Sequence, residues 1–453
     1  MTVQHRFLPT TPSDRADLLK ACGVHSIEDL LKGIPENVRF NGLLPSGPAQ
    51  SELEIKRRIR DLMKEGRYAK NALSFIGAGI YDHMCPSAVN QLTLRGEFLT
   101  SYTPYQPEMS QGTLQALFEF QTMVAELFGM EVSNASHYDG STSLAEAALM
   151  AMRINKGKNR LLISSSVHPE YVQVLKTYVA NLGVELSFVP LESGVTSVNS
   201  LKSLLSDDVM AVIIQSPNFY GCVEDLESLA SIAKACGAIF IVSTPETLSL
   251  AVLPSPGECG ADIATGEGQS FGVPQSFGGP FVGLFTSKLE YVRQMPGRLC
   301  GETIDAQGRR SYTLTLSTRE QHIRRDKATS NICTNQNLIA LWATIWLTLM
   351  GKEGFHELAV QNLSKAEYAK EAFLKTGKAK LRYPTQKTFN EFVIELKGSA
   401  ATFAQKAIEK GVAPGVVLNR FDASDTTGLL VCVTEKKSRD DIDYLAELLR
   451  DLA

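Results

Sequence analysis

The sequence lacks the features that would place a protein in a membrane or send it across one. Its longest apolar run, Leu338 to Met350, covers about thirteen residues and contains threonines, whereas a membrane helix needs roughly 18 to 20 apolar residues. The first residues, MTVQHRFLPTTPSD, contain neither the apolar stretch of a secretory signal nor the arginine-rich amphipathic pattern of a transit peptide. We therefore expect a soluble, cytoplasmic protein.

Strong net charge and paired cysteines are also missing. The 45 Lys and Arg against 49 Asp and Glu give a formal net charge of -4, which offers no support for a nucleic-acid or anionic-membrane partner. The eight cysteines are scattered without a CxxC spacing, so we expect reduced cysteines and no metal site. The chain has no internal repeat or low-complexity linker, and its 453 residues suffice for two or three domains.

Three parts are predicted along the chain. Residues 1–70 contain short helical pieces separated by breakers, which predicts a helical arm that packs on the main domain or on a second subunit. Residues 71–337 form a large α/β domain: between Arg160 and Phe285, apolar strands alternate with amphipathic helices, so we expect a mixed, mostly parallel sheet covered on both faces. Residues 338–453 are predicted as linking helices followed by a small C-terminal α+β domain.

The most informative stretch of the large domain is Asp262 to Gly283, DIATGEGQSFGVPQSFGGPFVG. Two short apolar runs flank a glycine-rich segment, which predicts a strand, a tight loop and a second strand. Glycines in such a loop let backbone N–H groups approach an anion, for example the phosphate of a cofactor. Tight packing explains the same composition, so both interpretations stay open.

Polar groups also gather where helices follow loops or strands. Ser141 and Thr142 precede an alanine-rich helix, whose first N–H groups are suited to bind an anion. Asp139 and Glu146 place negative charge at the same helix start, which would repel a phosphate. His168 follows the strand LLISSSV, at the sheet edge where ligands of parallel sheets bind, although a histidine bonded within its own loop fits as well.

The segment TPYQPEMSQG, at Thr103 to Gly112, is a first polar motif. Its two prolines stiffen the backbone and hold Tyr105 and Gln106 in one presentation. Rigid aromatic and amide groups on a loop are useful at a binding site or an interface, and ordinary loop packing is the alternative.

The segment TREQHIRRDKATSNICTNQ, at Thr318 to Gln336, is a second polar motif. Ser317 and Glu320 have the spacing of a capping box, which predicts a helix start there. Arg319 and Arg324 belong to a group of five basic side chains. This group is either a solvated face or the partner of an anionic group from another subunit.

Together with the glycine-rich loop, these two motifs resemble the P-protein of the glycine cleavage system, the pyridoxal-phosphate-dependent glycine decarboxylase. The resemblance covers nearly the whole chain and is strongest to subunit 1 of the two-subunit form. It implies fold type I of the pyridoxal-phosphate-dependent transferases. In the cofactor-carrying half of that family, the loop holds a His-Lys pair, but here Gln269 takes the place of the lysine. A carboxamide cannot form the Schiff base that tethers the cofactor.

A second requirement of this fold type fails at the strand AIFIVS. Related enzymes end this strand with an aspartate that keeps the pyridine nitrogen protonated. Here the chain continues with Ser243, Thr244 and Pro245, and no lysine occurs between Lys234 and Lys288. The resemblance therefore implies no catalytic residue in this chain and four vestigial cofactor positions: Ser141, Thr142, His168 and Gln269.

The function that the resemblance implies is that of a subunit inactive alone. A homologous subunit 2 would carry the lysine and the pyridoxal phosphate, so that the complex decarboxylates glycine and passes aminomethyl to the lipoyl group of the H-protein. We expect two copies of each subunit, with four groups of this chain reaching the partner's active site: Tyr105, Gln106, Arg319 and Arg324. Two alternatives stay open, a stand-alone pyridoxal-phosphate lyase or aminotransferase using another lysine, and a structural or regulatory binding subunit.

Overall fold

The computed structural model describes residues 7, 9–40, 42, 45, 47–65, 73–99, 102–276, 278–332 and 334–453. Contacts divide the chain into two units, Met1–Ala69 and Lys70–Ala453, and each is described by itself. Within the described ranges, helices with the length and apolarity needed to cross a membrane do not occur.

The described residues of the first unit form three α-helices and one 3-10 turn: α1 (Pro12–Ala21), α2 (Ile27–Leu30), η1 (Glu36–Val38) and α3 (Glu52–Glu65). Thr11 and Ser26 begin α1 and α2 with reciprocal capping boxes, because each hydroxyl accepts an N–H bond and each N3 aspartate bonds back to the cap. None of the described residues in this unit is buried. Its helices are therefore set by local capping rather than by a core of their own.

The second unit is built on a seven-stranded sheet with the order β2-β10-β9-β8-β7-β3-β4. Its strands are β2 (Val132–Ser133), β3 (Arg160–Ser164), β4 (Glu185–Val189), β7 (Val209–Gln215), β8 (Ile239–Thr244), β9 (Ile263–Glu267) and β10 (Gly283–Ser287). The five strands from β9 to β4 run parallel, and β10 is antiparallel to both β9 and β2. The predicted mixed, mostly parallel sheet is confirmed.

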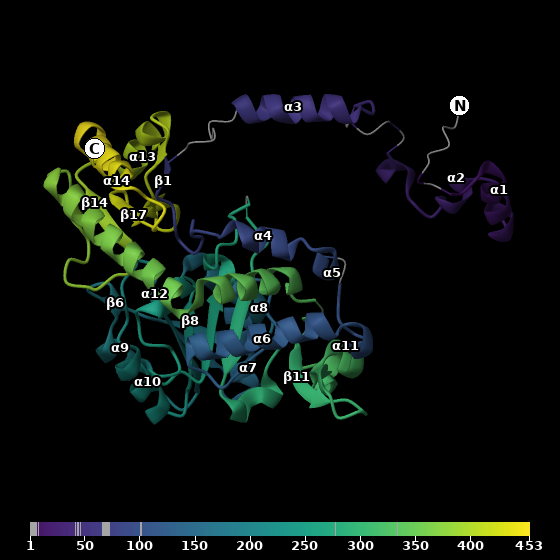
Figure 1. Ribbon diagram of the computed structural model, residues 1–453, viewed down its shortest axis with the longest axis horizontal. Helices are drawn as coiled ribbons and strands as arrows, with labels where there is room; N and C mark the ends of the chain where they lie inside the picture. Colours follow the sequence, from purple (N-terminus) through teal and green to yellow (C-terminus); the bar gives the residue numbers. More distant parts are fainter. Residues whose placement is uncertain are drawn as a thin grey trace. The chain divides into compact units, whose positions relative to one another are not determined.

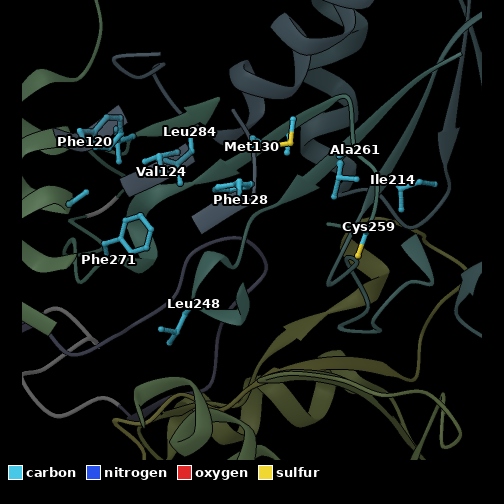
Figure 2. Packing of buried hydrophobic residues seen from close by; sticks show 14 of the residues in the cluster. Phe120, Val124, Phe128, Met130, Ile214, Leu248, Cys259, Ala261, Phe271 and Leu284 are labelled. Atoms are coloured by element: carbon cyan, nitrogen blue, oxygen red, sulfur yellow. The ribbon is translucent and has the colours of Figure 1, made fainter. Parts of the chain in front are cut away.

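Alternate residues of each central strand face opposite layers of helices. The main helices are α6 (Gln111–Phe128), α7 (Gly140–Ile154), α8 (Pro169–Val179), α9 (Val198–Leu204), α10 (Leu226–Ala235) and α12 (Asn337–Lys375). On β8, Phe240 and Val242 join the cluster of α6, α10 and α12, while Ile239 and Ile241 join the cluster of α7 and α8. Figure 1 shows α6 and α12 lying across the sheet, and Figure 2 shows the aromatic side chains that α6 contributes. Both faces are covered, which explains the continuous apolar runs of the strands.

A four-stranded antiparallel sheet, ordered β13-β14-β17-β16, forms the C-terminal α+β part. Its elements are β13 (Ala379–Leu381), β14 (Glu391–Leu396), α13 (Ala400–Glu409), β15 (Val412–Ala413), β16 (Val416–Val417), β17 (Gly428–Cys432) and α14 (Arg439–Leu452). Helix α12 runs from the large sheet to this part and bends at Gly351, where φ is 59°. The two helices predicted on either side of residue 351 are both present, and the non-helical backbone of Gly351 separates them within α12.

The segment before α6 links both parts. Strand β1 (Leu73–Ser74) pairs in parallel with β15, and the chain then continues through α4 (Ser87–Thr93), α5 (Gly96–Leu99) and η2 (Pro107–Met109). Residues 73–84 thus leave the small sheet and approach the large one.

The region between β10 and α12 differs from the sequence-based prediction. The predicted capping box is absent: Ser317–Arg319 is a 3-10 turn after Leu316 (φ 53°), and Glu320 precedes a four-residue helix, α11 (Gln321–Arg324), without a side-chain cap bond. The hairpin of β11 (Leu299–Ile304) and β12 (Arg310–Thr315) was not predicted. Glu320 fails as a cap because its carboxylate faces the guanidinium of Arg298.

Candidate functional site

Gln269 lies on the 3-10 turn η4 (Gly268–Ser270) directly after β9, and its side chain is buried. Its Oε1 accepts a bond from the N–H of Tyr81 at 2.7 Å, and its Nε2 donates to the carbonyls of Tyr81 and Val273, both at 2.7 Å. The side chain therefore pairs with the backbone of residue 81 as a neighbouring strand would. These three bonds give Gln269 a structural role. Its carboxamide nitrogen is not nucleophilic, so the side chain cannot form a Schiff base.

The N–H and hydroxyl groups at the start of α7 are already bonded to carboxyl groups of this chain. Asp139 is the N-cap, accepting bonds from the N–H and the hydroxyl of Thr142 and from the hydroxyl of Ser141. The carboxyl group of Glu267 accepts the N–H of Gly140 at 2.8 Å and two further N–H groups, of Gln269 and Val282, at 3.0 Å. A Cβ at position 140 would lie 2.5 Å from the hydroxyl oxygen of Tyr171 and 3.2 Å from Cβ of Glu267, so the close approach favours glycine.

Glu267 was not singled out by the sequence analysis. Burial raises its pKa to about 8, although the three N–H bonds act in the opposite direction. Ser141 and Thr142 lie inside the first turn of α7 rather than before it, and Glu146 lies in the second turn. There Glu146 is buried and accepts a bond from Ser330 at 3.1 Å, so it does not face the helix start as expected.

His168 caps α8 and is also bonded within the chain. Its Nδ1 accepts from the N–H of Glu170 at 3.1 Å, which makes Nε2 the protonated nitrogen that donates to the carbonyl of Ala78 at 2.9 Å. Its ring stacks on Tyr171 at 5.0 Å. Burial lowers the pKa of His168, so the ring is held neutral.

The end of β8 offers hydroxyls and no acid. Ser243 and Thr244 are fully buried, and neither hydroxyl has a hydrogen-bond partner among the residues that the structure describes. The nearest acid along the chain, Glu246, bonds instead to His83 at 3.0 Å and to Asn390 at 3.1 Å.

Pyridoxal phosphate, the group that this fold implies, does not fit these residues. The tethering position is Gln269, no acid ends β8, and Glu267 already accepts the N–H of Gly140 at the helix start that would hold a phosphate. No catalytic step through this group can therefore be derived from this chain.

The two polar motifs, far apart in sequence, meet at Arg298, which the sequence analysis did not single out. Its side chain donates to the hydroxyl of Tyr105 at 3.1 Å and to Oδ1 of Asn335 at 3.3 Å, and it faces Oε2 of Glu320 at 3.6 Å. Tyr105 itself is 55% exposed, with its ring edge toward His322. The exposed side chain of Tyr105 is thus bonded to the buried guanidinium of Arg298.

The other interface candidates are placed differently from one another. Gln106 and Arg324 are exposed, and Arg324 makes a bond to the carbonyl of Thr318 at 3.1 Å. Arg319 is buried, and its guanidinium donates to the carbonyls of Leu316, Met295 and Gly297. Arg319 therefore supports its own loop, whereas Tyr105, Gln106 and Arg324 face outward.

Close to Tyr102, the surface is hollowed between α5, α6 and α12. One cavity of about 280 Å³ is lined by residues that include Tyr102 and Asn335, and a second of about 440 Å³ shares Phe98, Ala116 and Leu341 with the first. Apolar atoms make up most of the lining surface of both cavities, and Asn335 of the first cavity also bonds to Arg298.

Known proteins resemble this chain over its full length. A family model described as glycine cleavage system P-protein matches residues 5–449. A protein of Anoxybacillus flavithermus, described as probable glycine dehydrogenase (decarboxylating) subunit 1, is 47% identical over 448 residues, covering 99% of each chain. A protein of Geotalea daltonii with the same description is 48% identical over 444 residues, covering 98% of this chain and 99% of the relative.

Solved structures agree with these similarities. The crystal structure of glycine decarboxylase (P-protein) of the glycine cleavage system, in inhibitor-bound form, superimposes with a TM-score of 0.88 at 39% identity, covering 99% of this chain and 100% of that chain. A NifS-like protein matches with a TM-score of 0.64 at 14% identity, covering 84% of this chain and 99% of that one. The predicted fold type I architecture is confirmed.

Proposed function

Because this chain belongs to the family of the glycine cleavage system P-protein, we propose that it is subunit 1 of a two-subunit glycine decarboxylase. One observation carries the proposal. The position where a Schiff-base lysine would stand holds Gln269, and its carboxamide bonds to the backbone of Tyr81. The chain acts with a homologous subunit that holds the lysine and pyridoxal phosphate. The complex decarboxylates glycine and transfers aminomethyl to the lipoyl group of the H-protein.

The absence of cofactor from this chain is part of the proposal. Its support is chemical: three separate requirements fail, at Gln269, at the end of β8 and at the start of α7, where Glu267 accepts the N–H of Gly140. The failures are independent, because replacing one residue would leave the other two. A stand-alone lyase or aminotransferase would have to place both a lysine and an acid elsewhere.

The surface around Tyr105 is the face that we assign to the partner subunit. Tyr105 is 55% exposed and Tyr102 is 75% exposed, and Tyr102 also lines the cavity of about 280 Å³ between α5, α6 and α12. A homologous subunit would cover this face, and enzymes of this fold build their active sites at subunit interfaces. We propose two copies of each subunit, with Tyr105, Gln106 and Arg324 facing the partner's cofactor.

Reconstitution tests the function. The chain alone, the partner alone and the mixture are assayed for exchange of the glycine carboxyl with labelled bicarbonate, and light scattering gives the assembly size. We expect exchange by the mixture and none by this chain, which also gains no visible Schiff-base absorbance with pyridoxal phosphate. Exchange by this chain alone, or absorbance that borohydride bleaches, would favour the stand-alone enzyme. A mixture without exchange and without assembly would contradict the proposed role.

A further inference from the structure

Arg298 is a buried cation that joins both polar motifs to one exposed ring. It precedes β11, is 5% exposed, and contacts residues that lie 193 positions before it and 37 positions after it, Tyr105 and Asn335. Its guanidinium carbon also lies 5.2 Å from the centroid of the Tyr105 ring. The same side chain thus contacts the hydroxyl and the ring of Tyr105.

These contacts fix a side chain that would otherwise rotate. The ring of Tyr105 is 55% exposed, so neighbouring side chains restrain it only in part. The bond to Arg298 at 3.1 Å and the edge contact with His322, with ring centroids 6.3 Å apart, hold it in one orientation. A ring held in its binding orientation loses less conformational entropy when it meets a partner.

Arg298 is itself held from the other side. Glu320, a buried carboxylate, balances its charge. Asn335 accepts from it through Oδ1 while its Nδ2 donates to the carbonyl of Ala135 at 2.9 Å and to the hydroxyl of Ser136 at 3.2 Å. The loop before α7 therefore supports the orientation of Tyr105 through Asn335 and Arg298.

We propose that Arg298 is a positioning residue, which orients Tyr105 toward the partner subunit's active site in the reaction proposed above, on which this inference rests. Arg298 acts through Tyr105 rather than on substrate. The planar fork of arginine contacts Tyr105, Asn335 and Glu320 together, whereas a lysine ammonium is a single point charge. Arg298→Lys therefore keeps the charge beside Glu320 and loses the orientation of the ring.

The test is a double-mutant cycle in the reconstituted holoenzyme, with Arg298→Lys, Tyr105→Phe and the double variant. We expect each single variant to lower kcat for carboxyl exchange about tenfold, within the range that misplacement of a positioned group produces, with KM for glycine within twofold. The double variant should be no slower than the slower single variant, because both changes remove the same contact. Light scattering should show unchanged assembly.

Arg310→Lys is the matched control. Arg310 also lies over a tyrosine ring, at 5.3 Å from that of Tyr312, and pairs with Glu302, but it lies on β12, away from the contacts of Tyr105. We expect exchange within twofold of wild type for this variant. An equal loss in Arg310→Lys would mean that any disturbance of the hairpin lowers activity, which overturns the assignment.

A second measurement does not depend on activity. In a fluorotyrosine-labelled isolated chain, the fluorine resonance of Tyr105 is assigned by its loss in Tyr105→Phe, and Arg298→Lys should narrow it because the ring moves more freely. Additive effects in the cycle, or an unchanged resonance, would overturn the role of Arg298. If wild type is active with its partner while both single variants stay within twofold of it, the inference fails and the proposed function stands. If wild type with its partner is inactive, the proposed function itself fails.

Discussion

Replacing His83 by glutamine should destabilise this chain more than any other histidine substitution in the described part of the chain. The ring is buried between two carboxylates, with Nε2 at 3.0 Å from Glu246 and Nδ1 at 2.8 Å from Glu435. Both carboxylate side chains are at most 5% exposed. Glu246 precedes η3 (Thr247–Ala251) of the large domain and Glu435 follows β17 of the small one, so His83 joins the two parts.

The magnitude follows from the charges. Burial lowers the pKa of His83, but Glu246 and Glu435 outweigh burial and raise the pKa from 6.5 to about 10, so the ring is a cation at neutral pH. Glutamine is neutral and leaves two buried carboxylates without their counter-ion. Breaking a buried ion pair in this way costs about 3 to 5 kcal/mol. We expect the free energy of unfolding at neutral pH to fall by that amount.

The pH dependence gives the sharper test. The folded pKa lies above the unfolded one, so the contribution of His83 is fully present below about pH 6.5 and is lost as the pH rises through about 10. The difference between wild type and His83→Gln should therefore shrink toward alkaline pH. Urea unfolding followed by tryptophan fluorescence measures this difference in the free energy of unfolding. Trp346 is a suitable reporter because it donates to the carbonyl of Met84, the residue after His83, at 3.0 Å. The exposed His356, changed to glutamine, is the control.

If His83→Gln lowers the free energy of unfolding by less than about 1 kcal/mol at neutral pH, the reasoning is refuted. Such a small loss would mean that Glu246 and Glu435 are neutral or solvated when the imidazolium is absent. A difference that stays constant from neutral to alkaline pH would refute the raised pKa while leaving a packing role for the ring.

Two further predictions concern the degenerate site. Gln269→Lys should give no Schiff-base absorbance with pyridoxal phosphate and should lower the free energy of unfolding by about 1 to 3 kcal/mol, since the N–H of Tyr81 loses its acceptor. A visible band that borohydride bleaches would show that the lysine alone was missing. Glu267→Gln should lower the free energy of unfolding, measured with a chemical denaturant, by about 1 to 3 kcal/mol. The reason is that an amide nitrogen in place of Oε2 cannot accept a hydrogen bond from the N–H of Gly140. The exposed Glu119, changed to glutamine, is its control, and equal losses would contradict the prediction.

The sheet could be predicted from sequence because its signal is local. Strands β7 and β8 are buried along their whole length, so their consecutive apolar residues reveal them directly. The break at Gly351 in α12 is also local, because a glycine between two helical patterns marks a change of direction. The hairpin of β11 and β12 was missed because its turn, Asp305 to Arg309, contains no Asn-Gly or Asp-Gly pair, and because Ile304 is exposed beside polar residues, which breaks the alternation of buried and exposed side chains.

Contacts between distant segments could not be predicted from one sequence. His83 and Glu435 are 352 positions apart, and nothing near either residue indicates the other. Ser317 and Glu320 have the spacing of a capping box, yet Glu320 faces Arg298 because a buried guanidinium needs a counter-charge. In both places a tertiary partner decided the role of a side chain, and local spacing carried no information on it.

The loss of the lysine position has a structural consequence that a single substitution cannot reverse. Buried backbone N–H groups need acceptors, and here Glu267 accepts those of Gly140, Gln269 and Val282, while Gln269 accepts that of Tyr81. A lysine at position 269 would leave the N–H of Tyr81 unpaired, and a phosphate at the start of α7 would compete with Glu267 for the N–H of Gly140. Recovering cofactor binding would therefore require at least positions 267 and 269 to change together, each step costing stability before any chemistry returned. Under the proposed function, the bonds within this site explain why the chain needs a partner that holds the cofactor.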